Sequence, residues 1–74
     1  MQCIYVQVEL FNNKKLIKTL KNRPLRISPN NHPAIVYKKR VYEITVGHIN
    51  LAGKTYTIND CKGYYDVIRL SVFN

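Results

Sequence analysis

The chain has 74 residues, of which 46% are hydrophobic, and its formal net charge at pH 7 is +8. So short a chain forms one domain over residues 1–74 and buries only about 60 to 65% of the surface that its unfolded form exposes, which argues against an elaborate catalytic cleft. The hydrophobic content argues equally against intrinsic disorder.

The first expected element is a strand over residues 3–11, because apolar residues there alternate with others. The residues of the apolar phase are Ile4, Val6, Val8 and Leu10. A period of two is typical of a half-buried strand, so we expect these four side chains to face the core.

Residues 14–21 allow two interpretations. Spaced at about 100° per residue, Leu16, Ile17 and Leu20 fall on one arc and the lysines fall on the other, which predicts an amphipathic helix. Lysines in the first turn would oppose the helix dipole, however, and a short window also fits the period of a strand. We favour the strand and keep a short helix over residues 14–21 as the alternative.

The next segment, residues 22–33, contains the three prolines of the chain, Pro24, Pro29 and Pro33. Proline has no backbone N–H to donate, so neither a helix nor an inner strand continues through it. We expect a loop or an irregular sheet edge here.

A short pattern occurs three times, at residues 11–16, 37–42 and 51–56: an apolar residue, two turn residues, a basic residue, one further residue and a large apolar residue. The turn residues are Asn12 and Asn13, Lys38 and Lys39, and Ala52 and Gly53. Asparagine and glycine tolerate the positive φ that two-residue hairpins need, which predicts turns at 12–13 and 52–53. The lysine pair marks either a third hairpin, by analogy, or a bulge.

The C-terminal part is expected to bend at Gly47, to turn at residues 61–63 and to end in a strand over residues 64–73. The inward residues of that strand are Ile68, Leu70 and Val72. Five or six short antiparallel strands cannot make two full sheets in a chain of this length. We therefore predict an all-β fold, one strongly bent sheet or a small barrel of the SH3-like or OB-like kind.

Positive charge is concentrated in one region of the chain. Nine basic residues and no acidic residue lie between Leu10 and Tyr42, whereas three basic and three acidic residues balance over residues 43–74. The nine are Lys14, Lys15, Lys18, Lys21, Arg23, Arg26, Lys38, Lys39 and Arg40. Such a region attracts polyanions or an acidic protein surface.

Nucleic-acid binding is the first functional hypothesis. Residues 37–42 place cations for phosphates and aromatic rings for bases at one expected hairpin tip. Tyr37 is the better stacking candidate, because Tyr42 follows a pattern expected for the core. The predicted interface therefore comprises Tyr37 and the nine basic residues, and it would hold DNA or RNA, single-stranded or without sequence preference. The alternative is that the lysines are only a solvated surface.

The second hypothesis is a small protein-binding module, such as an inhibitor of viral or mobile-element type, that docks on an acidic protein. Tyr5, Tyr64 and Tyr65 would then be interface anchors, since Tyr and Arg are enriched where binding energy concentrates. Alternatively, Tyr64 and Tyr65 only follow the Gly63 turn and cover the end of the barrel. Exposed sheet edges would also allow a homodimer.

The residues that carry catalytic or metal chemistry are too dispersed to predict a site. Cys3, Cys61, His32 and His48 lack the close pairing of zinc ligands, and single histidines lack a catalytic partner. A disulfide between Cys3 and Cys61 would need an oxidising compartment. No apolar run approaches the roughly 18 residues that cross a bilayer, and no signal-peptide pattern opens the chain. We expect a cytoplasmic non-enzyme without cofactors or a membrane association.

Overall fold

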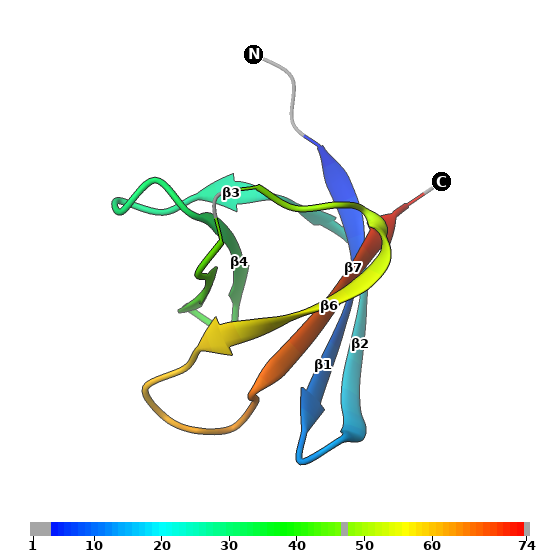
Figure 1. The fold of residues 1–74 in the computed structure, drawn as a ribbon, viewed down its shortest axis with the longest axis vertical. Helices are drawn as coiled ribbons and strands as arrows, with labels where there is room; N and C mark the ends of the chain where they lie inside the picture. Colours follow the sequence, from blue (N-terminus) through cyan, green and yellow to red (C-terminus); the bar gives the residue numbers. More distant parts are fainter. Residues whose placement is uncertain (1–3, 47, 74) are drawn as a thin grey trace.

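A computed structural model describes residues 4–46 and 48–73 of the chain, and these form one curled antiparallel sheet (Figure 1). The strands are β1 (Tyr5–Asn12), β2 (Lys15–Pro24), β3 (Arg26–Ile27), β4 (Pro33–Tyr37), β5 (Arg40–Ile44), β6 (Ala52–Asn59) and β7 (Val67–Val72). Their order in the sheet is β2-β1-β7-β6-β5-β4-β3. The predicted all-β class is confirmed, although the sheet has seven strands where five or six were expected.

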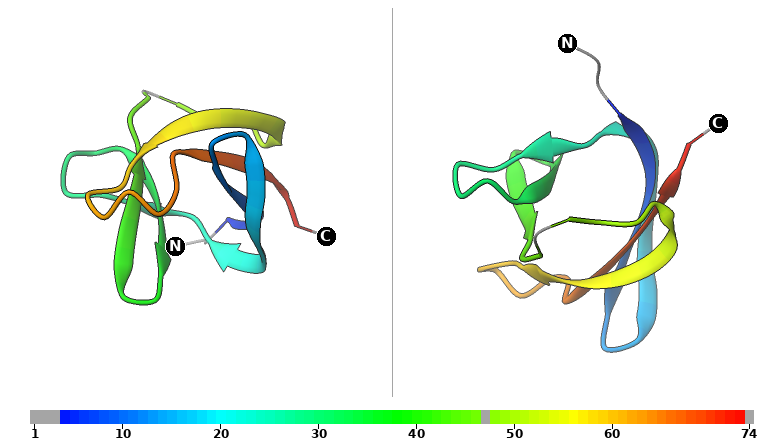
Figure 2. Two further views of the ribbon diagram at one scale, coloured as in Figure 1. Left: turned by 90° about the horizontal axis from the view of Figure 1, so that it is seen from below. Right: turned by 45° about the horizontal axis from the view of Figure 1, so that its top comes forward.

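The sheet curls into a half-barrel, so that β4 and β5 lie opposite β1 and β2. In Figure 1, β6 crosses in front of β1, β2 and β7. The two edge strands meet at a corner, because only Leu25 separates the end of β2 from the start of β3. The Leu25 N–H donates to the Ile4 carbonyl at 2.8 Å, which ties this corner to the start of β1. The left view in Figure 2 shows the β4–β5 hairpin, in green, projecting from the rest of the sheet.

The core fills the concave side of this curl. Its buried side chains are Val6, Val8, Leu10, Leu20, Ile35, Tyr42, Ile44, Ile58, Ile68 and Leu70. The alternation of β1 and β7 therefore predicted the core correctly, except at one end of the sheet. Ile4 and Val72 are 53% and 54% exposed, so the core ends before this rim of the sheet.

Residues 15–21 belong to strand β2, and the alternative of a helix over residues 14–21 is wrong. Asn13 and Lys14 have φ of 52° and 67° and make a two-residue turn, one residue later than expected, that folds β2 back on β1. Of the apolar arc, only Leu20 is buried, whereas Leu16 and Ile17 are 50% and 52% exposed. A helix needs a core along its whole apolar face, and the half-barrel covers β2 only at Leu20.

The two other expected hairpin turns have different outcomes. Lys38 and Lys39 form a two-residue turn with φ of 52° and 63°, which joins β4 to β5. The turn predicted at Ala52 and Gly53 is wrong, because both residues belong to β6. Gly53 has φ of 82° at a register shift in the pairing with β7, so the glycine serves a bulge. The described residues directly before β6, 48–51, are not a strand, so no hairpin forms at this position. The bend expected at Gly47 lies outside the described residues.

The proline segment is irregular, as expected, only over residues 28–32. Pro24 instead ends β2 and Pro33 begins β4, both at strand ends where a missing N–H is tolerated. The buried Ser28 hydroxyl organises the loop: it accepts the N–H of Asn30 and of His32, each at 3.2 Å, and donates to Glu43. This hydrogen bond, more than any other cause, lowers the pKa of Glu43.

Replacing Lys14 with glycine is expected to stabilise the fold. A residue with a Cβ is strained at the positive φ of Lys14, and an Asn-Gly pair is the preferred sequence for a two-residue turn with positive φ at both positions. The expected gain is about 0.5 to 1 kcal/mol, measured as the free energy of unfolding in urea. A Lys15→Gly variant is the control, because Lys15 lies in a strand, where glycine destabilises.

Candidate nucleic-acid interface

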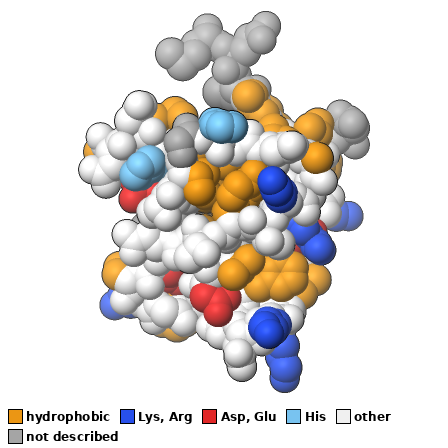
Figure 3. Space-filling view, viewed as in Figure 1, with side chains coloured by type: hydrophobic (Ala, Val, Ile, Leu, Met, Phe, Trp, Pro, Cys, Tyr) orange, Lys and Arg blue, Asp and Glu red, His pale blue; other side chains and the backbone are white. Residues whose placement is uncertain are grey.

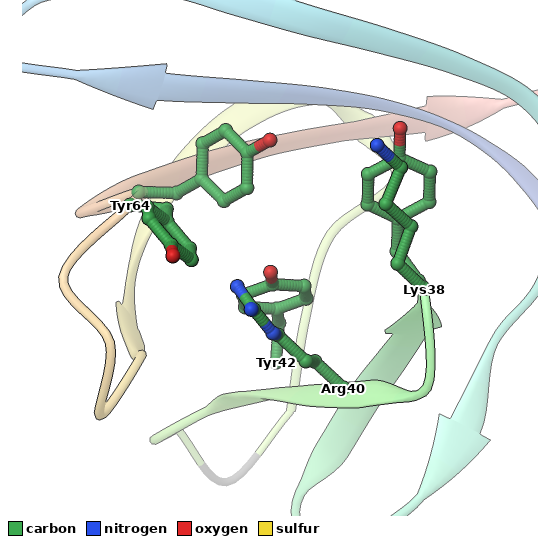
Figure 4. A pocket seen from close by; sticks show the side chains of 6 residues that line it. Lys38, Arg40, Tyr42 and Tyr64 are labelled. Atoms are coloured by element: carbon green, nitrogen blue, oxygen red, sulfur yellow. The ribbon is translucent and has the colours of Figure 1, made fainter.

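An open hollow of about 320 Å³ lies between the β4–β5 hairpin and the loop that joins β6 to β7. We call it the tyrosine hollow; its lining residues are Tyr37, Lys38, Arg40, Tyr42, Tyr64 and Tyr65. In Figure 4, Lys38 and Tyr64 stand on opposite sides of it, with Arg40 and Tyr42 between them. Four aromatic rings and two cations thus share one concavity.

The β4–β5 hairpin contributes Arg40 and Tyr42, which are positioned by the alternation of side chains along β5. Arg40 and Tyr42 are two residues apart in one strand, so their side chains leave the same face of the sheet. Tyr42 is only 2% exposed and forms the floor. Burial raises the pKa of the Tyr42 hydroxyl, which therefore stays protonated and able to donate.

The β6–β7 loop is held by Asp60. Its carboxylate accepts the N–H of Lys62 and of Tyr65, both at 3.0 Å, and its carbonyl accepts the N–H of Gly63 at 3.1 Å. The expected turn at residues 61–63 is confirmed, but the last strand starts at Val67 and not at residue 64. Tyr64 and Tyr65 consequently lie in a fixed loop beside β5.

The aromatic rings in and around the hollow pack in definite geometries. The rings of Tyr42 and Tyr65 meet edge to face, with centroids 5.6 Å apart and an interplanar angle of 74°. The guanidinium carbon of Arg40 lies 4.4 Å from the centroid of the Tyr64 ring. Tyr64 itself is 52% exposed, so this cation–π pair sits at the rim, where it is worth about 0.5 to 1 kcal/mol.

The ring of Tyr37 has two cations near it, one from β2 and one from the β4–β5 turn. The Lys38 ammonium nitrogen lies 5.5 Å and the Arg23 guanidinium carbon 5.8 Å from the centroid of its ring. Arg23 comes from the end of β2, so the corner of the half-barrel adds a third cation beside the hollow. The Tyr64 hydroxyl, and less strongly the Tyr42 hydroxyl, raises the pKa of Arg40, which stays fully charged.

The structure divides the ten predicted site residues into two groups. Arg23, Tyr37, Lys38 and Arg40 come together at the hollow, and Lys39 is exposed on the adjoining turn. The others lie elsewhere: Lys14 on the β1–β2 turn, Lys15, Lys18 and Lys21 along β2, and Arg26 on β3. The nine basic residues therefore do not form one continuous basic surface at the hollow.

Sequence reasoning did not place three tyrosines in this site. Tyr42 was expected in the core, which is correct for its ring, and Tyr64 and Tyr65 were assigned to a protein interface. The Gly63 turn followed by two tyrosines was the available signal. Only the pairing of β6 with β5 puts that loop next to the hairpin.

A second hollow, of about 440 Å³, lies on a different part of the surface and includes Phe11, Lys14, Val67 and Arg69 among its lining residues. Its arginine is already paired, since Arg69 donates two hydrogen bonds to the Glu9 carboxylate at 2.7 and 2.9 Å. On the face drawn in Figure 3, basic side chains are scattered between separate hydrophobic areas. The tyrosine hollow is thus the stronger candidate for an anionic ligand.

Other chemistry finds less support in residues 4–46 and 48–73. No three His, Cys, Asp or Glu side chains gather there to hold a metal ion, and no helix is present that could cross a membrane. His32 lies 3.4 Å from the Glu43 carboxylate, and His48 is exposed. Cys61 is exposed in the β6–β7 loop, and its suggested disulfide partner Cys3 lies outside the described residues.

No protein-family model, curated protein or solved structure matches this chain. The class of the protein is therefore defined by its own geometry: a small basic half-barrel with an open hollow of phenol rings and cations. None of the six residues that line this hollow in the described part of the chain is acidic. Such a lining suits a ligand that is both anionic and aromatic.

Proposed function

We propose that this protein binds single-stranded nucleic acid through the tyrosine hollow. The observation that carries the proposal is the convergence of four tyrosine rings with Lys38, Arg40 and the neighbouring Arg23 at one open concavity. Cations that meet phosphates and aromatic faces that stack with bases are the two components of single-strand binding sites.

The concave shape favours a single strand over a duplex. Bases in a duplex are stacked and paired, whereas an unpaired base can turn outward and enter a hollow. A volume of about 320 Å³ is at the lower end of the range for small-ligand sites, which fits one planar base better than a long segment. The cations at the rim are then in position for the phosphates on either side of that base.

Stacking of a base on Tyr37 requires Lys38 to leave the ring that it covers. An exposed cation–π contact is worth about 0.5 to 1 kcal/mol, less than the roughly 1.5 to 3 kcal/mol of a hydrogen bond to a charged group. An incoming phosphate can therefore draw Lys38 away from its ring and leave the ring face to a base.

The direct test is a fluorescence-anisotropy titration of a labelled single strand and of the matching duplex at several salt concentrations. We expect tighter binding of the single strand and a linear fall of log K with log salt. Equal affinity for both forms would contradict the proposed mode. If nuclease treatment of a native extract leaves one dominant bound protein, the acidic-protein hypothesis replaces the nucleic-acid hypothesis.

Replacing Tyr37 with alanine is expected to weaken single-strand binding by about 1 to 3 kcal/mol and to change duplex binding little, because a stacked base contributes about that much. Tyr5→Ala is the matched control, since Tyr5 is 47% exposed on β1 and does not line the hollow. Thermal unfolding is measured on both variants, and Tyr37→Leu retains the apolar packing. A loss for Tyr37→Leu on single strand and duplex alike would indicate backbone contact instead of stacking.

A further inference from the structure

We infer, on the basis of the proposed function, that the tyrosine hollow prefers guanine over adenine and that Arg40 reads the acceptor edge of guanine. The inference concerns which purine enters the hollow. It depends on the hydrogen-bonding groups of the lining and on the N–H donors that Arg40 keeps for a ligand.

The lining is rich in hydrogen-bond donors. Lys38 and Arg40 can only donate, and the four phenol hydroxyls donate one hydrogen bond each while also accepting. Neither a carboxylate nor a carboxamide belongs to the six lining residues. The groups that usually select cytosine (Asp or Glu) and adenine (Asn or Gln) are therefore missing from this lining.

Arg40 keeps N–H donors for a ligand. Its guanidinium carbon lies 4.4 Å from the centroid of the Tyr64 ring, and the hydroxyls of Tyr64 and Tyr42 also act on this group, but a guanidinium has five N–H donors and two hydroxyls occupy only some of them. Within residues 4–46 and 48–73, the two ion pairs of the structure are His32 with Glu43 and Arg69 with Glu9, so no carboxylate engages Arg40. In Figure 4 the guanidinium projects over the hollow beside Tyr42.

Guanine is the purine that matches a guanidinium fork. It presents the two acceptors N7 and O6 side by side, whereas adenine presents one acceptor beside an amino donor. A bidentate pair with guanine should therefore improve binding by about 5- to 150-fold over adenine.

The experiment compares labelled thymidine hexamers that carry one central guanine, adenine or cytosine with the all-thymidine hexamer, by anisotropy on the full chain. A single guanine per strand avoids quadruplexes. The hexamer with guanine is expected to bind more tightly than the hexamer with adenine. Arg40→Lys is expected to abolish this preference, because lysine keeps the charge but not the fork.

Arg26→Lys is the matched control, since Arg26 is exposed on β3 outside the hollow and should leave the preference unchanged. Equal binding of the guanine and adenine hexamers would overturn this inference and leave the proposed function standing. A preference for adenine over guanine, or a guanine preference that survives in Arg40→Lys, would also overturn it. Failure of every hexamer to bind would overturn the proposed function itself, and this inference with it.

Discussion

A variant with Lys38, Lys39 and Arg40 all replaced by alanine is expected to lose single-strand affinity by about 100-fold or more at low salt. Hydrogen bonds to charged groups are worth about 1.5 to 3 kcal/mol each, and the variant removes two cations of the hollow and one on the adjoining turn. Each lost phosphate contact also removes about 0.7 from the slope of log K against log salt for a single strand. The slope should therefore fall by up to about 2.

The control for this variant removes the same charge from another place. Lys14, Lys15 and Lys18 lie on the β1–β2 turn and on β2, and none of them lines the tyrosine hollow. Their triple replacement by alanine should lower affinity by less than tenfold. If both triple variants lose affinity and slope equally, the ligand responds to net charge and not to the hollow. Thermal unfolding of both variants, followed by circular dichroism, establishes that each is folded.

The fold could be predicted from the sequence where the alternating apolar residues of a strand all lie on its buried face. The period of two in β1 identified its three buried residues, and the same period identified Ile68 and Leu70 in β7. Burial at every second residue needs only a sheet that is covered on one side. That condition holds along the middle of both strands, so the local pattern was sufficient there.

Prediction failed where the secondary structure of a segment depends on which other parts of the fold cover it. Leu16 and Ile17 are apolar but exposed on β2, so their arc is equally consistent with a helix when only the sequence is known. Ala52 and Gly53 have the composition of a hairpin turn, but the structure uses them at a bulge in β6, because the segment before them is not a strand. Neither outcome can be deduced from a window of six residues.

The sequence could bring together only the contiguous half of the candidate site. Residues 37–42 show the aromatic and basic alternation directly, and four of them line the hollow: Tyr37, Lys38, Arg40 and Tyr42. Arg23 and the tyrosines of the β6–β7 loop lie more than ten positions away along the chain. Their approach depends on the curl of the sheet and on the β5–β6 pairing, which no local pattern encodes.

Replacing Leu70 with alanine is expected to cost about 2 to 5 kcal/mol of the free energy of unfolding. Leu70 is fully buried in β7, which lies between β1 and β6 in the sheet, and it pairs with Val8 on β1. Domains have about 0.05 to 0.15 kcal/mol of stability per residue, so a chain of this size has about 4 to 11 kcal/mol in total. The variant should therefore lose a large part of its stability, measured by urea unfolding, and melt at least about 10 °C lower.

Val72→Ala is the control on the same strand and the same face. Val72 pairs with Val6 but is 54% exposed, so its truncation should change the free energy of unfolding by no more than about 0.5 kcal/mol. The strand alternation alone predicts equal burial for Leu70 and Val72, whereas the curled sheet ends its core between them. A cost for Val72→Ala close to that for Leu70→Ala would mean that the core extends to the rim of the half-barrel, and the fold described above would be wrong at this end.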